Sequence, residues 1–227
     1  LKKNFYRFFG KRILTLSLDD FYYNKYQRKL LSKSIHPLML TRGVPGTHNT
    51  KEILNIIKKF NKSQYPIELP IFDKLTDTQI KRKRIINMKS NILILEGWCC
   101  GAPALKNKYL QVNINKLEKK FDTEYIWRNY YNSQLKKEYF ELFKKFNGLI
   151  YFKAPSFSQV FKWRLKQENY MKKKHKESRQ GMNRQEIAEF IQHYEKITKW
   201  MMKVLPAKAN LTVHVDKNQN IRKISNV

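Results

Sequence analysis

Two adjacent carboxylates, Asp19 and Asp20, follow a hydrophobic run and precede the aromatic pair Phe21 and Tyr22. The run, residues 13–18, has the length of a buried strand. In open α/β sheets, ligands bind beyond the carboxyl ends of the strands, and an aspartate there can accept a proton from a substrate hydroxyl. The same pair is also typical of a turn or a helix cap. The residues alone therefore predict either a catalytic carboxylate or a structural turn.

The segments that would position these carboxylates alternate between two kinds of pattern. Short apolar runs predict β-strands at residues 13–18, 91–95, 148–152 and 211–215, and their lengths are those of buried strands. Patterns of helical period predict helices at residues 51–60, 122–146 and 185–205. Strands that alternate with helices are typical of an α/β fold, in which helices flank a parallel sheet. An apolar stripe in the second helical segment is expected in the core: Trp127, Tyr130, Tyr131, Leu135, Phe140 and Phe143.

Length and composition favour one packed domain. The chain has 227 residues and an aromatic content of 14%, which suits a hydrophobic core. It contains no run near the length of about 20 apolar residues that spans a bilayer, and no signal-peptide segment near residue 1. The two cysteines, Cys99 and Cys100, are neighbours, which suits neither a disulfide framework nor a zinc site. We therefore predict a soluble, cytoplasmic protein without a membrane partner.

The formal net charge of +29 is the footprint expected of a nucleic-acid-binding protein. A second interpretation is that A+T-rich coding enriches Lys together with Asn, Ile, Tyr and Phe. The basic runs at 81–84 and 172–176 are separated by long ordinary segments and form no single stripe. We do not expect a nucleic-acid partner on this basis, and a basic nucleic-acid-binding protein is kept as an alternative.

Several sequence blocks occur in an order that is specific in combination. They include Ser-Leu-Asp-Asp-Phe-Tyr at 17–22, Gly-Val-Pro-Gly-Thr-His at 43–48, Leu-Pro-Ile-Phe-Asp-Lys at 69–74, Leu-Glu-Gly-Trp-Cys at 95–99, and further blocks at 154–157, 163–168, 181–182 and 190–195. Over roughly residues 11–217 the chain resembles the P-loop kinase family of D-glycerate 3-kinase and its bacterial relatives, akin to uridine kinase, phosphoribulokinase and pantothenate kinase. The resemblance implies a P-loop NTPase kinase fold. It also implies ATP, Mg²⁺ and the phosphorylation of a hydroxyl of a small acid, D-glycerate first.

The resemblance gives three residues a role in catalysis. Asp19 is expected to orient and deprotonate the acceptor hydroxyl, with Asp20 as the fallback. Glu96 is expected to hold Mg²⁺ through water, and its alternative is an acidic cap of the next helix. Arg164, at the start of a lid at about 164–183, is expected to reach the transferring phosphate. The alternative for Arg164 is a helix-surface cation.

The resemblance also implies a substrate-binding set: Asp20, Tyr22, Arg42, His48, Asp73 and Lys74. Arg42 and His48 frame a Gly/Pro-rich loop, and the Arg42 guanidinium could hold a substrate carboxylate bidentately. Asp73 and Lys74 are expected either in the same pocket or in a loop salt bridge. After the Gly-Thr-His run the chain has Asn49 where relatives have Asp, which puts contacts to substrate hydroxyls in doubt.

The family's phosphate-binding loop is the one expected motif that this sequence does not contain. No Gly-x-x-x-x-Gly-Lys-Ser/Thr occurs, and the chain has seven glycines in total. Residues 1–9 resemble the end of the helix that follows that loop, so we expect a single kinase-like domain over 1–227 that is truncated before its second strand and inactive alone. Pro206 and Ala207 are expected at the adenine site. A degenerate kinase fold kept as an interaction module is a further alternative.

Overall fold

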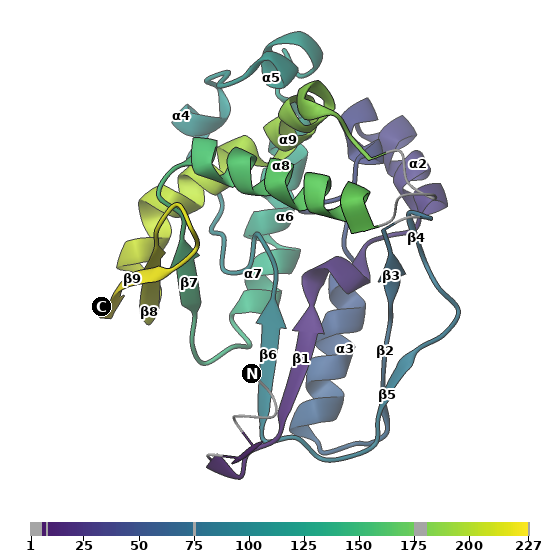
Figure 1. The fold of residues 1–227 in the computed structure, drawn as a ribbon. Helices are drawn as coiled ribbons and strands as arrows, with labels where there is room; N and C mark the ends of the chain where they lie inside the picture. Colours follow the sequence, from purple (N-terminus) through teal and green to yellow (C-terminus); the bar gives the residue numbers. More distant parts are fainter. Residues whose placement is uncertain (1–5, 8, 75, 175–180, 227) are drawn as a thin grey trace. The chain divides into compact units, whose positions relative to one another are not determined.

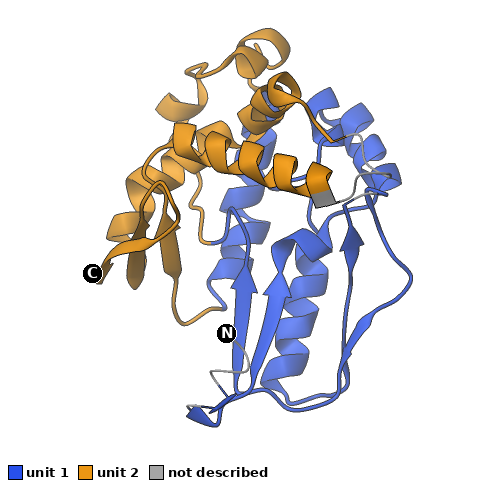
Figure 2. Ribbon diagram, in the orientation of Figure 1, with its two compact units in different colours: residues 1–100, 126–145 blue, residues 101–125, 146–227 orange. Residues whose placement is uncertain are grey.

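The computed structural model describes residues 6–7, 9–74, 76–174 and 181–226. They form two compact units (Figure 2): residues 1–100 with 126–145, called unit 1, and residues 101–125 with 146–227, called unit 2. The single kinase-like domain stays a prediction. Part of the predicted lid, residues 175–180, and most of the predicted N-terminal helix end lie outside the described residues.

Unit 1 contains the expected strand and helix around Asp19, together with several shorter elements (Figure 1). In chain order these are β1 (Ile13–Ser17), η1 (Leu18–Phe21), α2 (Lys25–Ser34), η2 (Pro37–Leu40), α3 (Thr50–Asn61), β2 (Ile67–Leu69), β3 (Phe72–Asp73), β4 (Thr78–Gln79), β5 (Arg84–Ile86), β6 (Ile92–Glu96), α6 (Ile126–Lys136) and α7 (Glu138–Phe143). The strands β2 to β5, with two or three residues each, were not predicted.

The parallel pair β1 and β6 is the centre of unit 1. The register runs from Ile13 opposite Ile92 to Ser17 opposite Glu96, so both strands end at the same edge. In β1, Leu14 and Leu16 are buried, as the alternation of a strand with one covered face requires. In β6 the residues from 92 to 95 are only half-buried, whereas the sequence predicted a buried strand.

The helices of unit 1 follow the apolar spacing of the sequence, with one exception. In α3, Ile53, Ile56 and Ile57 are buried on one face, and the helix contacts β2, η1 and α7. The single helix predicted over 122–146 is instead two helices, because Lys137 adopts φ −108° and ψ −90° and ends the helical path. As a consequence Tyr139 is buried in α7, and Phe140, predicted in the core, is 59% exposed.

Unit 2 carries a second, separate sheet. Its elements are α4 (Asn107–Leu110), α5 (Lys116–Phe121), β7 (Ile150–Lys153), α8 (Phe157–Lys174), α9 (Arg184–Val204), η3 (Leu205–Ala207), β8 (Leu211–Val215) and β9 (Ile221–Asn226). The strand order is β7-β8-β9, with β7 parallel and β9 antiparallel to β8. In the predicted strand that became β7, Ile150 and Phe152 are more than half exposed, so it is not a buried strand as expected.

Two long helices dominate the rest of unit 2. α9 begins at a capping box, in which the Asn183 side chain and the Glu186 side chain each bind the other residue's backbone. Lys196 of α9 is buried and donates to the carbonyls of Tyr109 and Val112, and it pairs with Glu118 at 3.2 Å. These contacts fix α9 to the segment that carries α4 and α5. Of the lid predicted at about 164–183, residues 164–174 belong to α8.

Among the described helices, none is long and apolar enough to cross a membrane.

Candidate active site

The end of β1 places Asp19 at the carboxyl edge of the parallel pair. After Ser17 the chain turns into the short 3₁₀ helix η1, in which Leu18 and Phe21 are buried and the two carboxylates face outward, half-buried. Asp19 Oδ1 accepts a hydrogen bond from the Tyr22 hydroxyl at 2.7 Å. Its Oδ2 lies 2.6 Å from Lys74 Nζ. The structure thus brings together three of the predicted site residues on one carboxylate.

The pKa of Asp19 results from opposed effects. Burial raises it, whereas the hydrogen bond and charge of Lys74 and the hydrogen bond from Tyr22 lower it, and the net effect is a pKa below the usual value of 3.8. Asp19 is therefore ionised at neutral pH. An ionised carboxylate can accept a hydrogen bond from a hydroxyl, which is what the orientation of an alcohol nucleophile requires.

The predicted acceptor loop, residues 42–48, is tied to the segment that carries Asp19. The Tyr23 N–H donates to the Thr47 carbonyl and the Asn49 N–H donates to the Phe21 carbonyl, both at 2.8 Å. The His48 ring stacks on the Tyr22 ring with 4.5 Å between centroids. His48 therefore joins Asp19, Tyr22 and Lys74 in one cluster.

Close packing also fixes the shape of this loop. Gly46 has φ +97°, in the region that favours glycine, and a Cβ atom there would lie 2.7 Å from the Tyr130 ring. Its N–H donates to the Tyr139 hydroxyl at 3.2 Å. Tyr139 was not predicted as a site residue, because its neighbours in the sequence form an apolar stripe of helical period.

Arg42, predicted to bind a substrate carboxylate, is held by a carboxylate of the chain itself. Its Nη1 lies 2.5 Å from Asp77 Oδ1, and the other oxygen of Asp77 lies 2.5 Å from Nη2 of Arg28. Arg28 is buried, and Arg42 is 26% exposed. The guanidinium of Arg42 is thus fixed in place by an anion and still reaches solvent. Asp77 carries no sequence signal, since it stands between two threonines in a polar loop.

Asp20 and Asp73 support the loop structure around this cluster. Asp20 Oδ1 accepts the N–H of Phe72 at 3.3 Å, which joins η1 to β3. Asp73 Oδ2 accepts the Thr76 hydroxyl at 2.8 Å. Lys74 forms a salt bridge with Asp19, and its place in a substrate pocket stays a prediction.

Asn49, where the resemblance expects an aspartate, caps a helix. Its side-chain oxygen accepts the N–H of Glu52 at 3.2 Å, and its amide donates to the Glu52 carboxylate at 3.0 Å. An N-cap needs only an acceptor oxygen, which asparagine supplies as well as aspartate does. The substitution is therefore compatible with the local structure.

Glu96 ends β6 opposite Ser17, at the same strand edge as Asp19. Its side chain is exposed. Within the described residues no group of three or more His, Cys, Asp and Glu side chains could hold a metal ion by itself. Mg²⁺ is typically held by one or two carboxylates, waters and substrate phosphates, so a single exposed carboxylate at this edge fits the predicted ion.

The remaining predicted residues belong to unit 2. Arg164 of α8 pairs with the buried Glu168 one turn later, at 2.8 Å, and Glu168 also accepts the N–H of Met182 at 3.2 Å. Glu168 thus ties α8 to the end of the predicted lid. Pro206 and Ala207, predicted at the adenine site, form the short helix η3 after α9.

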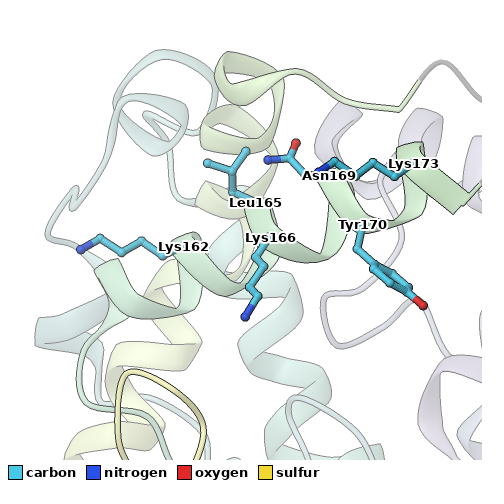
Figure 3. A pocket seen from close by; sticks show the side chains of 6 residues that line it. All are labelled: Lys162, Leu165, Lys166, Asn169, Tyr170 and Lys173. Carbon is cyan, nitrogen blue, oxygen red and sulfur yellow. The ribbon is translucent and has the colours of Figure 1, made fainter.

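A hollow of about 410 Å³ runs along α8 and is basic (Figure 3). Its lining residues are Lys162, Leu165, Lys166, Asn169, Tyr170 and Lys173. Three of these six side chains are lysines from one helix, and Tyr170 adds an aromatic surface. Such a surface attracts anions, and it was not predicted, because Lys162 and Lys166 lie outside the basic run at 172–176 that contains Lys173.

No model of a known protein family matches the sequence. The chain is similar to the uncharacterized kinase mug58 of Schizosaccharomyces pombe, with 27% identity over 217 residues that cover 90% of this chain and 76% of the relative. Among solved structures it is similar to a D-glycerate 3-kinase from Cryptococcus neoformans var. grubii, with a TM-score of 0.82, 24% identity and coverage of 100% of this chain and 84% of that chain. It is also similar to the YGR205w protein, with a TM-score of 0.77, 23% identity and coverage of 99% and 81%.

These relatives confirm the predicted resemblance and the predicted α/β fold with parallel strands and flanking helices. In the described residues the parallel strands lie in two sheets of two and three strands, and β9 adds an antiparallel edge that was not predicted.

Proposed function

We propose that this protein, which shares the fold of a D-glycerate 3-kinase and is similar in sequence to a kinase, transfers the γ-phosphoryl group of ATP to a hydroxyl of a small hydroxy acid. D-Glycerate is the first candidate acceptor. The observation that carries the proposal is the ionised carboxylate of Asp19 at the end of β1, held by Lys74 and Tyr22.

Asp19 acts on the acceptor hydroxyl in this proposal. Its carboxylate accepts the hydroxyl proton in a hydrogen bond, and it takes the proton as the oxygen bonds to phosphorus. In a loose transition state little proton transfer is needed early, so a carboxylate of low pKa suffices for orientation. Lys74 and Tyr22 hold that carboxylate in one orientation, which lowers the entropic part of the barrier.

Recognition of the acid group falls to Arg42. A guanidinium presents two parallel N–H donors to a carboxylate, and Asp77 fixes one edge of the Arg42 side chain while the residue stays partly exposed. Asp20 and Asp73 shape the neighbouring loop, and His48 closes the cluster from the side of the acceptor loop.

The nucleotide side of the reaction is assigned to further residues. Bound Mg²⁺ would neutralise phosphate charge, and Glu96 is the carboxylate proposed to hold it through water. Arg164 is proposed to supply positive charge to the transferring phosphate. Pro206 and Ala207 are proposed at the adenine ring.

P-loop kinases bind the phosphates of ATP with a Gly-rich loop, and the sequence contains no such motif. The test therefore uses the product of the natural gene read in full, with ATP, Mg²⁺ and a panel of D-glycerate, other hydroxy acids, pantothenate and nucleosides. ADP formation that depends on D-glycerate is expected. If no member of the panel stimulates ADP formation, the proposal fails.

Asp19→Asn is the decisive variant. It keeps the shape of the side chain and removes the base, so kcat should fall about 10²–10⁴-fold. Asp20→Asn tests the fallback residue, and Asp216→Asn is the matched control, since Asp216 accepts the N–H groups of Asn218 and Asn220 in the turn before β9. A loss of kcat in Asp20→Asn but not in Asp19→Asn would move the base to Asp20.

A further inference from the structure

One hydroxyl group holds the acceptor loop at two points. The oxygen of Tyr139 lies 2.5 Å from His48 Nδ1 and 3.2 Å from the backbone nitrogen of Gly46. Both ring side chains are fully buried, with 0% of their surface exposed. Tyr139 comes from α7, more than 90 positions later in the chain, so this contact joins two distant segments of unit 1.

The protonation states in this trio follow from burial. Burial lowers the pKa of His48 to about 3 and raises the pKa of Tyr139 well above its usual value. At neutral pH the imidazole is therefore uncharged and the phenol keeps its proton. Each of the two groups then has one proton to place.

The hydrogen-bond directions favour one arrangement. The Gly46 N–H can only donate, so the Tyr139 oxygen accepts from it. If His48 Nδ1 also donated to that oxygen, the buried Tyr139 O–H would have no acceptor in the described part of the chain; the O–H therefore donates to Nδ1, and the single imidazole proton is on Nε2. In the part of the chain that the structure describes, His48 Nε2 is buried without a hydrogen-bond partner. Tyr139 therefore imposes a tautomer that the local surroundings of Nε2 do not favour.

This tautomer matters because the imidazole lies against the Asp19 cluster. Its ring stacks on Tyr22, whose hydroxyl donates to Asp19. A fixed imidazole keeps the Tyr22 ring from rotating away, and the Tyr22 hydroxyl keeps the Asp19 carboxylate in one orientation. Three contacts thus join Tyr139 to the proposed base: Tyr139 to His48, His48 to Tyr22, and Tyr22 to Asp19. In the described residues, the hydrogen bonds of Tyr139 are to Gly46 and His48 and not to Asp19 or Lys74.

We propose that Tyr139 is a positioning residue, which fixes His48 as its Nε2–H tautomer and thereby holds the acceptor loop and the Tyr22–Asp19 pair for acceptor binding. The role in acceptor binding rests on the proposed kinase function. The tautomer of His48 and the hydrogen bonds that hold the acceptor loop do not depend on that function, so they can be tested without an activity assay.

The first test is an NMR measurement on the wild-type chain with ¹⁵N-labelled histidine at neutral pH. The two nitrogens of a neutral imidazole have clearly different shifts according to which one carries the proton. The result expected is a His48 with a protonated Nε2 and an unprotonated Nδ1. A His48 with the proton on Nδ1, or a charged imidazole, would overturn the proposal without any reference to catalysis.

The second test compares Tyr139→Phe with Tyr65→Phe. Tyr65 is the matched control, because its hydroxyl also accepts a backbone N–H, that of Ser90 at 2.9 Å, in another part of unit 1. Tyr139→Phe should change the ¹⁵N pattern of His48, whereas Tyr65→Phe should leave it as in the wild type. An unchanged pattern in a folded Tyr139→Phe protein contradicts the proposal, and the wild-type measurement still decides the tautomer if that variant does not fold.

The kinetic test uses the full-length product of the natural gene. Tyr139→Phe should raise KM for the acceptor about tenfold and leave KM for ATP within about twofold, since the lost contacts hold only the acceptor loop. Equal changes in both constants would indicate general disruption and would contradict the positioning role. If wild-type protein phosphorylates no acceptor, the kinase proposal fails, and the tautomer measurements still decide the structural part.

Discussion

Asp19 combines partial burial with the attraction of one neighbouring cation. Burial alone would raise its pKa, and Lys74 contributes the two largest effects in the opposite direction. A carboxylate in this position is sensitive to a single neighbour. Its pKa therefore reports whether the salt bridge exists in solution.

Replacing Lys74 by Met should raise the pKa of Asp19, because the hydrogen bond and the charge are lost while the burial remains. A ¹³C titration of the Asp19 carboxyl carbon by NMR measures this shift. Lys144→Met is the control, since Lys144 pairs with Glu141 on the surface of α7. An Asp19 pKa that stays at its wild-type value in Lys74→Met would show that the ion pair does not form.

At the scale of single residues, the sequence predicted a residue's place where its chemical type and its position in an element both pointed to the same site. Asp19 could be predicted because a run of apolar residues places it at a strand end, where ligands bind. A role for Tyr139 could not be predicted, because a tyrosine in an aromatic stripe is usually a core residue. The helix also breaks at Lys137, so the spacing of the stripe before the break does not tell on which face Tyr139 lies. Asp77 lies 35 positions from Arg42 and 49 from Arg28, and no local pattern joins them.

Among elements, the carboxylate of Asp77 joins three parts of unit 1. Arg28 of α2 donates to Asp77 and also to the carbonyls of Tyr23 and Leu40, and Arg42 donates to the second oxygen of Asp77. Asp77 precedes β4 and has φ +56°, a conformation that Asp and Asn adopt more readily than most residues. Asp77 thereby links the start of β4 to α2 and to the start of the acceptor loop.

Asp77→Asn should lower the free energy of unfolding by about 2 kcal/mol, because two charge-assisted hydrogen bonds lose their anionic acceptor and Arg28 is buried. Asparagine keeps the unusual backbone conformation accessible, so the change isolates the charge. Urea unfolding at low salt measures it.

The matched control is Glu141→Gln, which removes the charge of an exposed pair with Lys144. Its effect should stay within about 0.5 kcal/mol. If the two variants lose equal stability, the Asp77 pair is no stronger than a surface salt bridge, and Arg42 is not fixed by it.

The elements could be predicted where their apolar pattern is regular and not by length alone, since α8 with 18 residues and β9 with six were not predicted. The strands β1, β6, β7 and β8, with four or five residues each, give continuous apolar runs, and α3 and α9 show a clear helical period. Strands of two or three residues, such as β2 and β3, are too short for any period to be visible. The break between α6 and α7 depends on one residue, Lys137, whose side chain gives no signal of a bend.

Over the whole molecule, 47 lysines and arginines face 18 acidic residues. A carboxylate of this chain that forms an ion pair is therefore surrounded by more cations than anions. Acidification protonates further groups and raises the net positive charge. Histidines with a pKa lowered by burial make the protein less stable on acidification. They bind a proton in the unfolded chain at a pH at which they stay neutral in the folded chain. His48 in unit 1 and His193 in unit 2 both have a pKa lowered by burial.

The resulting pH dependence has a definite sign and window. The pKa of His48 is about 3 in the folded protein and near 6.5 when unfolded, so between these values the unfolded state binds the extra proton. The free energy of unfolding should therefore fall as pH decreases from 6.5, by about 1.4 kcal/mol per pH unit for one such group at full slope. The lowered pKa of Asp19 adds a further loss only near and below its usual value of 3.8.

Urea unfolding between about pH 4.5 and 6 separates the two contributions, because His48 acts across that window and Asp19 acts only near and below 3.8. His48→Gln should reduce the slope of stability against pH by about one proton, and it should do so even if the variant is less stable at pH 7. His193→Gln should also reduce the slope, and the double variant should have a smaller slope than either single variant. A His48→Gln protein with the wild-type slope would mean that His48 is not held neutral by burial, and the hydrogen-bond directions assigned to Tyr139 and Gly46 would then be wrong as well.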